Sequence, residues 1–260
     1  MKQDVLKELR YGLRNNRFLI LAAFMLFFAI ATPVMIKVVL PQVMMSQMPG
    51  LTMETLEQMM DMTQRGVLLG YMGDQFEIGS LVIALTLCGL LAQEIHDNTL
   101  VLPLCSGKRF ASIVLAKLLV FGLALLLLPG LSLLVCYLYA GLLFDFTVGL
   151  APVLVSGLLQ GLFTVFMLSG LLLTGALLKK PIAAGLTTLL ATYGLYALGS
   201  LLKLNTYLPT GLLVEAQKLT LPAFGDWIGP VAITVVGIAV FTYLTLLRLR
   251  RLEWNARAAG

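Results

Sequence analysis

The sequence predicts an all-α membrane protein with six transmembrane helices. Of its 260 residues, 59% are hydrophobic and only 12% are charged, whereas a soluble domain is about 45–50% apolar and about 25% charged. The mean hydropathy is +0.95. Apolar runs reach about twenty residues without the alternation that barrel strands require. We therefore expect helical spans in one transmembrane domain over residues 1–260.

Residues 1–17 are polar and basic, and they predict an amphipathic helix at the membrane interface. Leu6, Leu9 and Leu13 recur at helical spacing beside a basic stripe. Such a helix lies in the headgroup layer with its apolar side on lipid and its cations on anionic headgroups. A basic flank of the first span explains the same residues. Membrane lipid is therefore an expected partner.

Six apolar runs follow, and each is a candidate for crossing a hydrocarbon core of about 30 Å at 1.5 Å per residue. A long excursion separates the first two runs, and residues 51–64 within it show an amphipathic pattern. This pattern predicts a helix lying against the outer face of the bundle. The predicted spans are residues 18–40, 76–93, 112–140, 150–178, 182–202 and 228–248.

The basic residues predict the orientation. Fourteen of the 18 fall on the two termini and on the loops that share their side. The positive-inside rule therefore places both termini in the cytoplasm, in agreement with an even number of spans. The net charge of +5 is explained by this bias and by anionic lipid, so no nucleic-acid partner is expected. The basic residues of the other side are Lys37, Arg65, Lys203 and Lys218.

The most polar interruption between apolar runs is the stretch 91–117. It holds the single histidine, His96, between Glu94 and Asp97, and then Lys108 and Arg109. Charged residues at the bilayer centre cost about 2.5–3.5 kcal/mol each on insertion scales, so these side chains face water or a partner. The stretch is therefore either a cytoplasmic contact loop or a simple solvated turn.

Several kinds of chemistry find no support in the sequence. The only histidine lies at a membrane edge, which argues against an intramembrane serine protease, and there is no HExxH zinc motif. Gly107-Lys108 lacks a phosphate loop's leading glycine and its Ser/Thr. The central parts of the predicted spans carry no charge, which argues against an ion-coupled carrier. We expect a non-catalytic chain without a cofactor of its own.

Two features are candidates for a substrate path. Gln160 in the fourth span forms an interhelical hydrogen bond or contacts substrate. Met59 and Met60 lie in the outer amphipathic segment, within a methionine-rich region. Methionine is a flexible apolar filler and also a soft ligand for Cu(I). Because no cysteine or histidine accompanies these residues, we expect an apolar surface without metal.

The stretch from Glu94 to Lys117 resembles the membrane subunits (permeases) of type-two ABC exporters. Those families carry an acidic residue at the end of the second span, then Gly-Thr, a Pro-x-Ser-Arg-like turn, and a lysine entering the third span. Asn98 departs from the glycine, although asparagine tolerates a left-handed turn. The inserted Gly107-Lys108 shifts Arg109 relative to the pattern. The matching residues are Glu94, Thr99, Pro103, Ser106, Arg109 and Lys117.

The resemblance implies a partner and a site. In the family, two membrane subunits work with two cytoplasmic ATPases, which carry the ATP and Mg²⁺, and this loop forms a short coupling helix that docks on the ATPase. The likeness implies a permease in the bacterial cytoplasmic membrane, paired with a second copy or another permease. It would export an amphiphile: a peptide, lipid or lipid-linked glycan. The residues leave open an ion-coupled carrier or channel and a non-transport scaffold. The expected ATPase-coupling residues are Glu94, His96, Asp97, Asn98, Thr99, Lys108 and Arg109.

Overall fold

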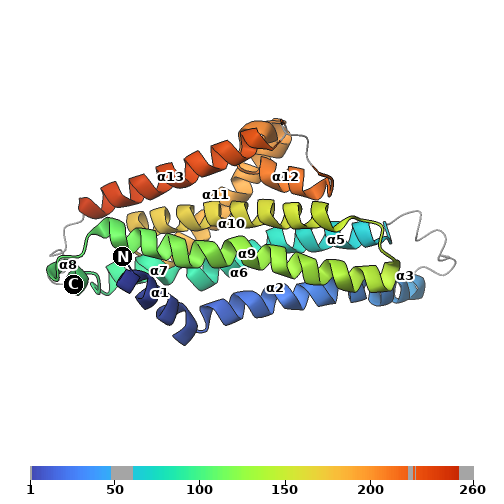
Figure 1. Ribbon diagram of the computed structural model, residues 1–260, viewed down its shortest axis with the longest axis horizontal. Coiled ribbons are helices and arrows are strands. Elements are labelled where there is room, and N and C mark those ends of the chain that lie inside the picture. Colours follow the sequence, from blue (N-terminus) through green and yellow to red (C-terminus); the bar gives the residue numbers. More distant parts are fainter. Residues whose placement is uncertain (1, 48–60, 222–224, 226, 252–260) are drawn as a thin grey trace.

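The computed structural model describes residues 2–47, 61–221, 225 and 227–251, and within these ranges the secondary structure is entirely helical. Six helices in this part of the chain are long and apolar enough to cross a membrane, which confirms the predicted all-α membrane fold. They run along the long axis of one bundle (Figure 1). The six candidate spans are Arg17–Gln47, Gln64–His96, Phe110–Phe144, Leu150–Leu178, Pro181–Leu201 and Ile228–Arg250.

The first two spans contain several helical segments, and short helices lie outside the spans. The first span comprises α2 (Arg17–Val34), the π-helical turn η1 (Met35–Val39) and α3 (Leu40–Gln47). The second comprises α5 (Gln64–Asp74), the π-helical turn η2 (Gln75–Gly79), α6 (Ser80–Leu87) and α7 (Gly89–His96). The other elements are α1 (Lys2–Arg14), α8 (Val101–Cys105), α9 (Phe110–Phe144), α10 (Leu150–Leu178), α11 (Pro181–Leu201), η3 (Asn205–Tyr207), α12 (Gly211–Gln217) and α13 (Ile228–Arg250).

The helix predicted within residues 1–17 is present as α1. It covers Lys2–Arg14, and the chain then bends at Asn16, whose φ of 56° is left-handed. The second span is longer than the predicted 76–93, because its helix already begins at Gln64. Hydropathy detects only the part of a helix that lies in lipid, whereas backbone hydrogen bonding continues into water. The predicted outer helix at 51–64 lies outside the described residues except for its end.

Helices α9 and α10 pack closely through glycines. A Cβ on Gly157 would lie 2.6 Å from the Cα of Gly130, and a Cβ on Gly161 would lie 2.2 Å from the carbonyl oxygen of Leu126. Gly157 and Gly161 form a GxxxG pair, which lets two helix backbones approach each other. The short helix α12 packs against the N-terminal part of α10, where the Ser156 hydroxyl donates to the carbonyl of Ala216 at 2.8 Å. These contacts make α10 central to the bundle.

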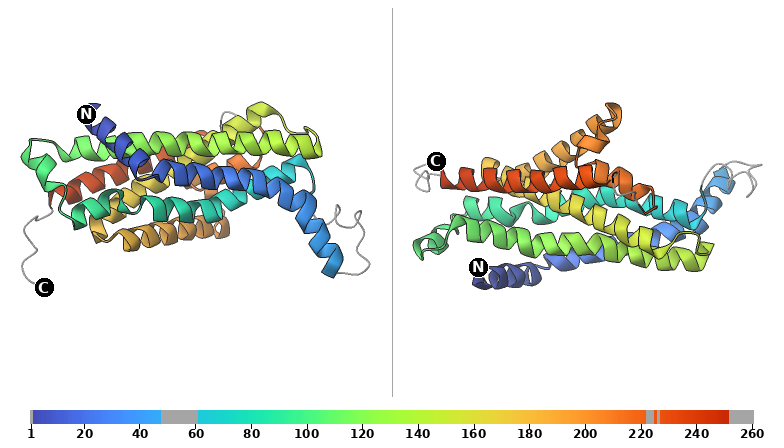
Figure 2. Two further views of the ribbon diagram at one scale, coloured as in Figure 1. Left: turned by 90° about the horizontal axis from the view of Figure 1, so that it is seen from below. Right: turned by 45° about the horizontal axis from the view of Figure 1, so that its top comes forward.

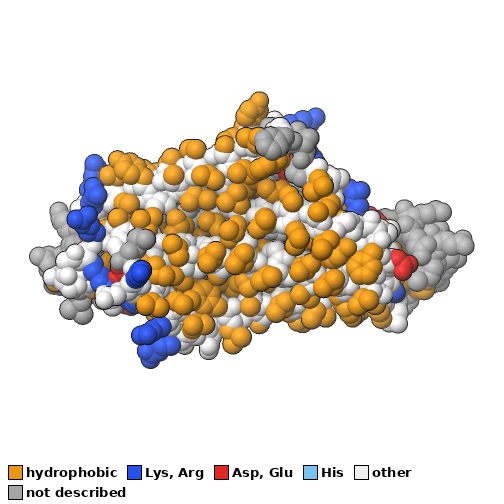
Figure 3. Space-filling view, viewed as in Figure 1, with side chains coloured by type: hydrophobic (Ala, Val, Ile, Leu, Met, Phe, Trp, Pro, Cys, Tyr) orange, Lys and Arg blue, Asp and Glu red, His pale blue; other side chains and the backbone are white. Residues whose placement is uncertain are grey.

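One end of the bundle, which we call the α8 end, gathers α1, α8 and the last turn of α13 (Figures 1 and 2). Basic side chains concentrate there in the space-filling view, whereas the flank of the bundle is covered by hydrophobic side chains (Figure 3). The sequence predicted that these segments share one side. The site described next lies at this end.

Candidate functional site

The turn after α7 is fixed by a complete C-terminal cap. Asn98 adopts the left-handed conformation, with φ 54°. Its N–H donates to the carbonyl of Ile95 at 3.2 Å, and the N–H of Thr99 donates to the carbonyl of Glu94 at 3.0 Å. This pair of bonds is the Schellman motif. The Thr99 hydroxyl donates to the same carbonyl at 3.3 Å, so the turn has one defined path.

A second cap of the same kind ends α8. Gly107 has φ 81°, where glycine carries no steric cost. Its N–H donates to the carbonyl of Leu104 at 3.0 Å, and the N–H of Lys108 donates to the carbonyl of Pro103 at 3.1 Å. The Gly107-Lys108 insertion is therefore the terminator of a short helix. Together the two caps make α8 a defined element between the second and third spans.

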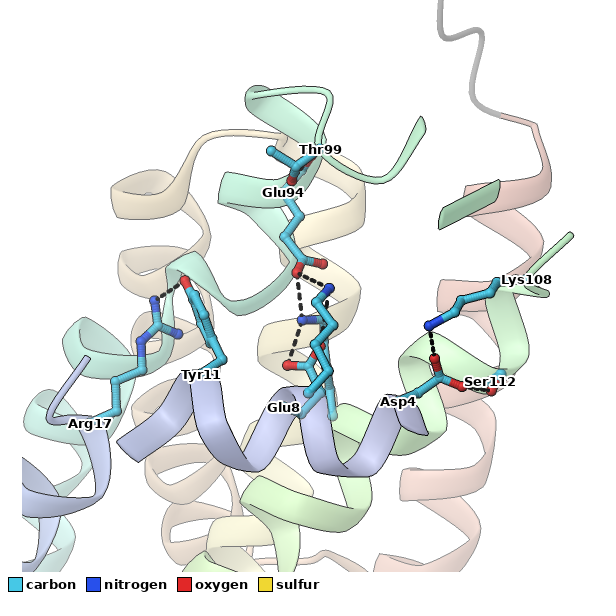
Figure 4. A network of polar contacts seen from close by, with 10 residues as sticks. Asp4, Glu8, Tyr11, Arg17, Glu94, Thr99, Lys108 and Ser112 are labelled. Atoms are coloured by element: carbon cyan, nitrogen blue, oxygen red, sulfur yellow. Dashed lines mark hydrogen bonds and ion pairs between the residues drawn. The ribbon is translucent and has the colours of Figure 1, made fainter. Parts of the chain in front are cut away.

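Lys117 of α9 is completely buried and binds two carboxylates from other helices, those of Glu8 and Glu94, which Figure 4 labels. Its Nζ lies 2.9 Å from Oε2 of Glu8 on α1 and 3.0 Å from Oε1 of Glu94 on α7. The Glu8 side chain is only 2% exposed and that of Glu94 13%. Lys7, which is half exposed, lies 3.6 Å from the same Glu94 oxygen. We call Glu8, Glu94 and Lys117 the clamp, because it joins α1, α7 and α9.

A second polar contact holds the start of α1 against the turn that follows α8. Lys108 Nζ donates to Oδ1 of Asp4, and the Ser112 hydroxyl donates to Oδ2 at 2.6 Å (Figure 4). The Lys108 ammonium and then the Ser112 hydroxyl hold the pKa of Asp4 well below its usual range. The carboxylate is therefore ionised at neutral pH. Both flanks of α8 are thus tied to α1.

Helix α1 therefore has a buried acidic face, an exposed leucine face and an exposed basic face. Asp4 and Glu8 lie one turn apart on the buried face, which packs on α9. Near the end of α1, the Tyr11 hydroxyl accepts from Arg17 at 3.1 Å, with the guanidinium over the Tyr11 ring. The leucine stripe is exposed, as a face on lipid requires. The exposed leucines are Leu6, Leu9 and Leu13.

The structure separates the seven expected coupling residues into two groups. Glu94 and Lys108 form ion pairs within the chain, and Asn98 shapes the first cap. The other four side chains are exposed around α8, although Asp97 accepts from Gln93 at 2.5 Å. These exposed residues are His96, Asp97, Thr99 and Arg109.

Sequence reasoning missed the contributions of Asp4 and Glu8. It assigned α1 an apolar and a basic stripe, and it left its two acidic residues without a role. A signal was present, because two carboxylates four residues apart share a helix face. Their spacing could not identify the lysines that bind them, since those lie more than a hundred residues away.

Gln160 is buried, and it lines a cavity of only about 10 Å³ together with Gln75, Ser80 and Thr164. Its Oε1 and both side-chain polar atoms of Gln75 have no hydrogen-bond partner among the described residues. The interhelical hydrogen bond expected for Gln160 is therefore not made through its oxygen. The other substrate-path candidates, Met59 and Met60, lie outside the described residues.

Neither the clamp nor the capped helix α8 can be assigned by likeness to a characterised protein. Comparison of the chain with protein-family models, curated proteins and solved structures finds no match.

Proposed function

We propose that this chain is the membrane subunit of an ATP-driven exporter and that α8 is the element through which a separate cytoplasmic ATPase moves the bundle. The observation that carries the proposal is the double bracing of α8. Glu94 of the span before it lies 3.6 Å from Lys7 of α1 and 3.0 Å from Lys117 of the span after it. Lys117 also binds Glu8 of α1, and Lys108, which directly follows α8, binds Asp4 of α1. A displacement of α8 is therefore passed to two spans together.

The proposal assigns different roles to the two groups of charged residues. Glu94 and Lys108 brace α8 from inside, so they do not serve as contacts for the ATPase. Exposed side chains around α8, such as Asp97 and Arg109, are available to a soluble partner. The basic α8 end is the cytoplasmic side by the positive-inside rule, which places α8 where ATP is present.

The bundle contributes the path for the substrate. Its lipid-facing side is apolar, and the buried amide of Gln75 and the buried Oε1 of Gln160 have no hydrogen-bond partner among the described residues. A buried polar group without a partner is unfavourable, so a state in which these amides bind water or substrate gains stability. This combination suits an amphiphilic cargo. The bundle changes state only if the ATPase binds its two states with different affinity.

The test is capture of the ATPase. We would express the full chain with the ABC ATPases of its source genome, purify through this chain, and measure ATP hydrolysis before and after assembly. We expect one ATPase to co-purify and its rate to rise. Arg109→Glu should reduce capture at least about tenfold, because like charges brought together cost several kcal/mol. Lys180→Glu, at an exposed site on the same side, is the control.

The alternatives give different results. If the chain alone in liposomes supports flux along an ion or solute gradient, it is a carrier or channel. If it captures no ATPase and supports no flux, it is a scaffold. Either outcome overturns the proposal.

A further inference from the structure

The exposed surface of α1 is more cationic than its composition indicates. The helix contains four basic and two acidic residues, but both acidic residues are on the buried face. Lys7, Arg10 and Arg14 are exposed and recur at i, i+3 and i+7, which places them along one side. The clamp holds Glu8 and the Lys108–Ser112 contact holds Asp4 away from the surface, which leaves a stripe of three cations.

This stripe lines an open hollow of about 620 Å³. Besides the three cations, the amides of Gln3 and Asn15 lie along it, and Leu6 joins it to the exposed leucine stripe. The surface thus combines cations and hydrogen-bond donors with an adjacent apolar face. It is long, charged and only partly enclosed.

We propose that this face of α1 binds the headgroup of an anionic phospholipid. Two arginines suit a phosphate, because guanidinium groups bind it with two hydrogen bonds. The neighbouring leucines suit the acyl chains of the same molecule. A zwitterionic lipid fits less well, since its own cation offsets its phosphate. A soluble phosphate ester would leave the apolar face unused, so the ligand is a membrane lipid.

Lys7 connects this lipid site with the clamp. Its ammonium lines the hollow and also lies 3.6 Å from Glu94 and 3.8 Å from Glu8. A lipid phosphate and the clamp carboxylates therefore compete for one cation. Bound lipid weakens the hold of α1 on α7, and α8 gains freedom to respond to its partner. This regulatory step rests on the proposed function, whereas the lipid site does not.

The binding test uses the purified full chain in detergent, titrated with dioctanoyl phosphatidylglycerol or dioctanoyl phosphatidylcholine and read by native mass spectrometry. We expect preference for phosphatidylglycerol. Arg10→Gln/Arg14→Gln should reduce that affinity about 25-fold, from about fivefold per basic residue at a lipid surface, with phosphatidylcholine binding unchanged. Lys180→Gln/Arg250→Gln removes the same charge from exposed positions on the same side and should bind phosphatidylglycerol as wild type does.

The melting temperature of lipid-free Arg10→Gln/Arg14→Gln should equal that of wild type, which shows that the fold is retained. Three results would overturn the lipid site: equal affinity for the two lipids, an equal loss in the control variant, or displacement of phosphatidylglycerol by an equal concentration of glycerol 3-phosphate. The first indicates binding that does not depend on the charge of the headgroup, the second non-specific charge attraction, and the third a soluble ligand.

The regulatory step has its own readout. In nanodiscs that hold the assembled exporter, phosphatidylglycerol should raise ATP hydrolysis above the level in phosphatidylcholine, and Lys7→Gln should remove most of that difference. An undiminished difference in Lys7→Gln refutes the regulation but leaves lipid binding intact. Failure to capture any ATPase refutes the proposed function, and the binding titration still decides the lipid site.

Discussion

Replacing Lys117 by methionine should destabilise the bundle strongly. The substitution leaves a side chain of similar length but removes the buried ammonium that lies within 3.0 Å of carboxylate oxygens of both Glu8 and Glu94. Their carboxylates would then face each other within about 6 Å, where like charges oppose ionisation. Removing one partner of a buried ion pair costs about 3–5 kcal/mol. At about 2–4 °C per kcal/mol for a chain of this size, the melting temperature should fall by about 10 °C.

The double variant Lys117→Met/Glu8→Gln separates this explanation from a simple packing defect. With Glu8 neutral, only Glu94 remains charged, and its side chain is partly exposed. The double variant should therefore be more stable than Lys117→Met, although Glu8→Gln alone should be less stable than wild type. Both are measured by thermal unfolding of the purified full chain in detergent. Lys180→Met, at an exposed site on the same side, should change stability by no more than about 0.5 kcal/mol.

Two results would refute this reasoning. If Lys117→Met melts within about 2 °C of wild type, the ion pairs do not hold α1 to the bundle. If the double variant is no more stable than Lys117→Met, the loss comes from packing around the lysine and not from carboxylates left without their buried cation.

Three further substitutions test the neighbouring contacts. Gly107→Val forces a branched side chain into the left-handed region at φ 81° and should lower stability by at least about 1 kcal/mol in a thermal melt. Asn98→Gly should have little effect, because glycine adopts this conformation freely. Equal effects of the two substitutions would contradict the cap at Gly107. Because the pKa of Asp4 is depressed, its stabilisation is present above the usual pKa of 3.8 and is lost as pH falls below that value. Hydrogen exchange of α1 should thus be insensitive to this group between pH 7 and 5, and Asp4→Asn should raise exchange throughout; unchanged exchange in that variant would exclude a tether. Gln160→Leu removes a buried oxygen that has no partner among the described residues. It should increase the free energy of unfolding by up to about 3 kcal/mol, and so raise the melting temperature, while slowing transport. A less stable variant would show that the amide oxygen is hydrogen-bonded.

The sequence was sufficient to predict six membrane-length helices and the gathering of the basic segments at one end of the bundle, because both depend on local composition. Hydrophobic length identifies a helix in lipid, and the bias of basic residues is additive along the chain. Asn98 was also assigned correctly from its residue type, since few non-glycine residues adopt the left-handed turn. The helix that extends from Gln64 was missed because charged residues such as Arg65 mark where lipid ends and not where the helix ends.

The clamp could not be derived in this way, because it depends on which helices lie side by side. Lys117 could be placed at the membrane edge from its position in the third span, but its carboxylate partners come from α1 and α7. The packing of α9 on α10 carried a readable signal, since Gly157 and Gly161 form a GxxxG pair in an apolar run. Gly130, which Gly157 contacts, lies in another helix, so this contact can be identified only from the fold.

The physical reason for a charged clamp at this end follows from the solvent around the bundle. Lipid tails are as apolar as leucine, so burying the leucines of α1 against protein gains little over leaving them in the membrane. An α1 with only apolar and basic faces would therefore have no fixed rotation on α9. Asp4 and Glu8 fix the rotation of α1 about its axis, because their ion pairs with Lys108 and Lys117 form together in one register of α1 on α9 only. The same register directs Lys7, Arg10 and Arg14 outward, so the contacts that brace α8 also create the cationic face of α1.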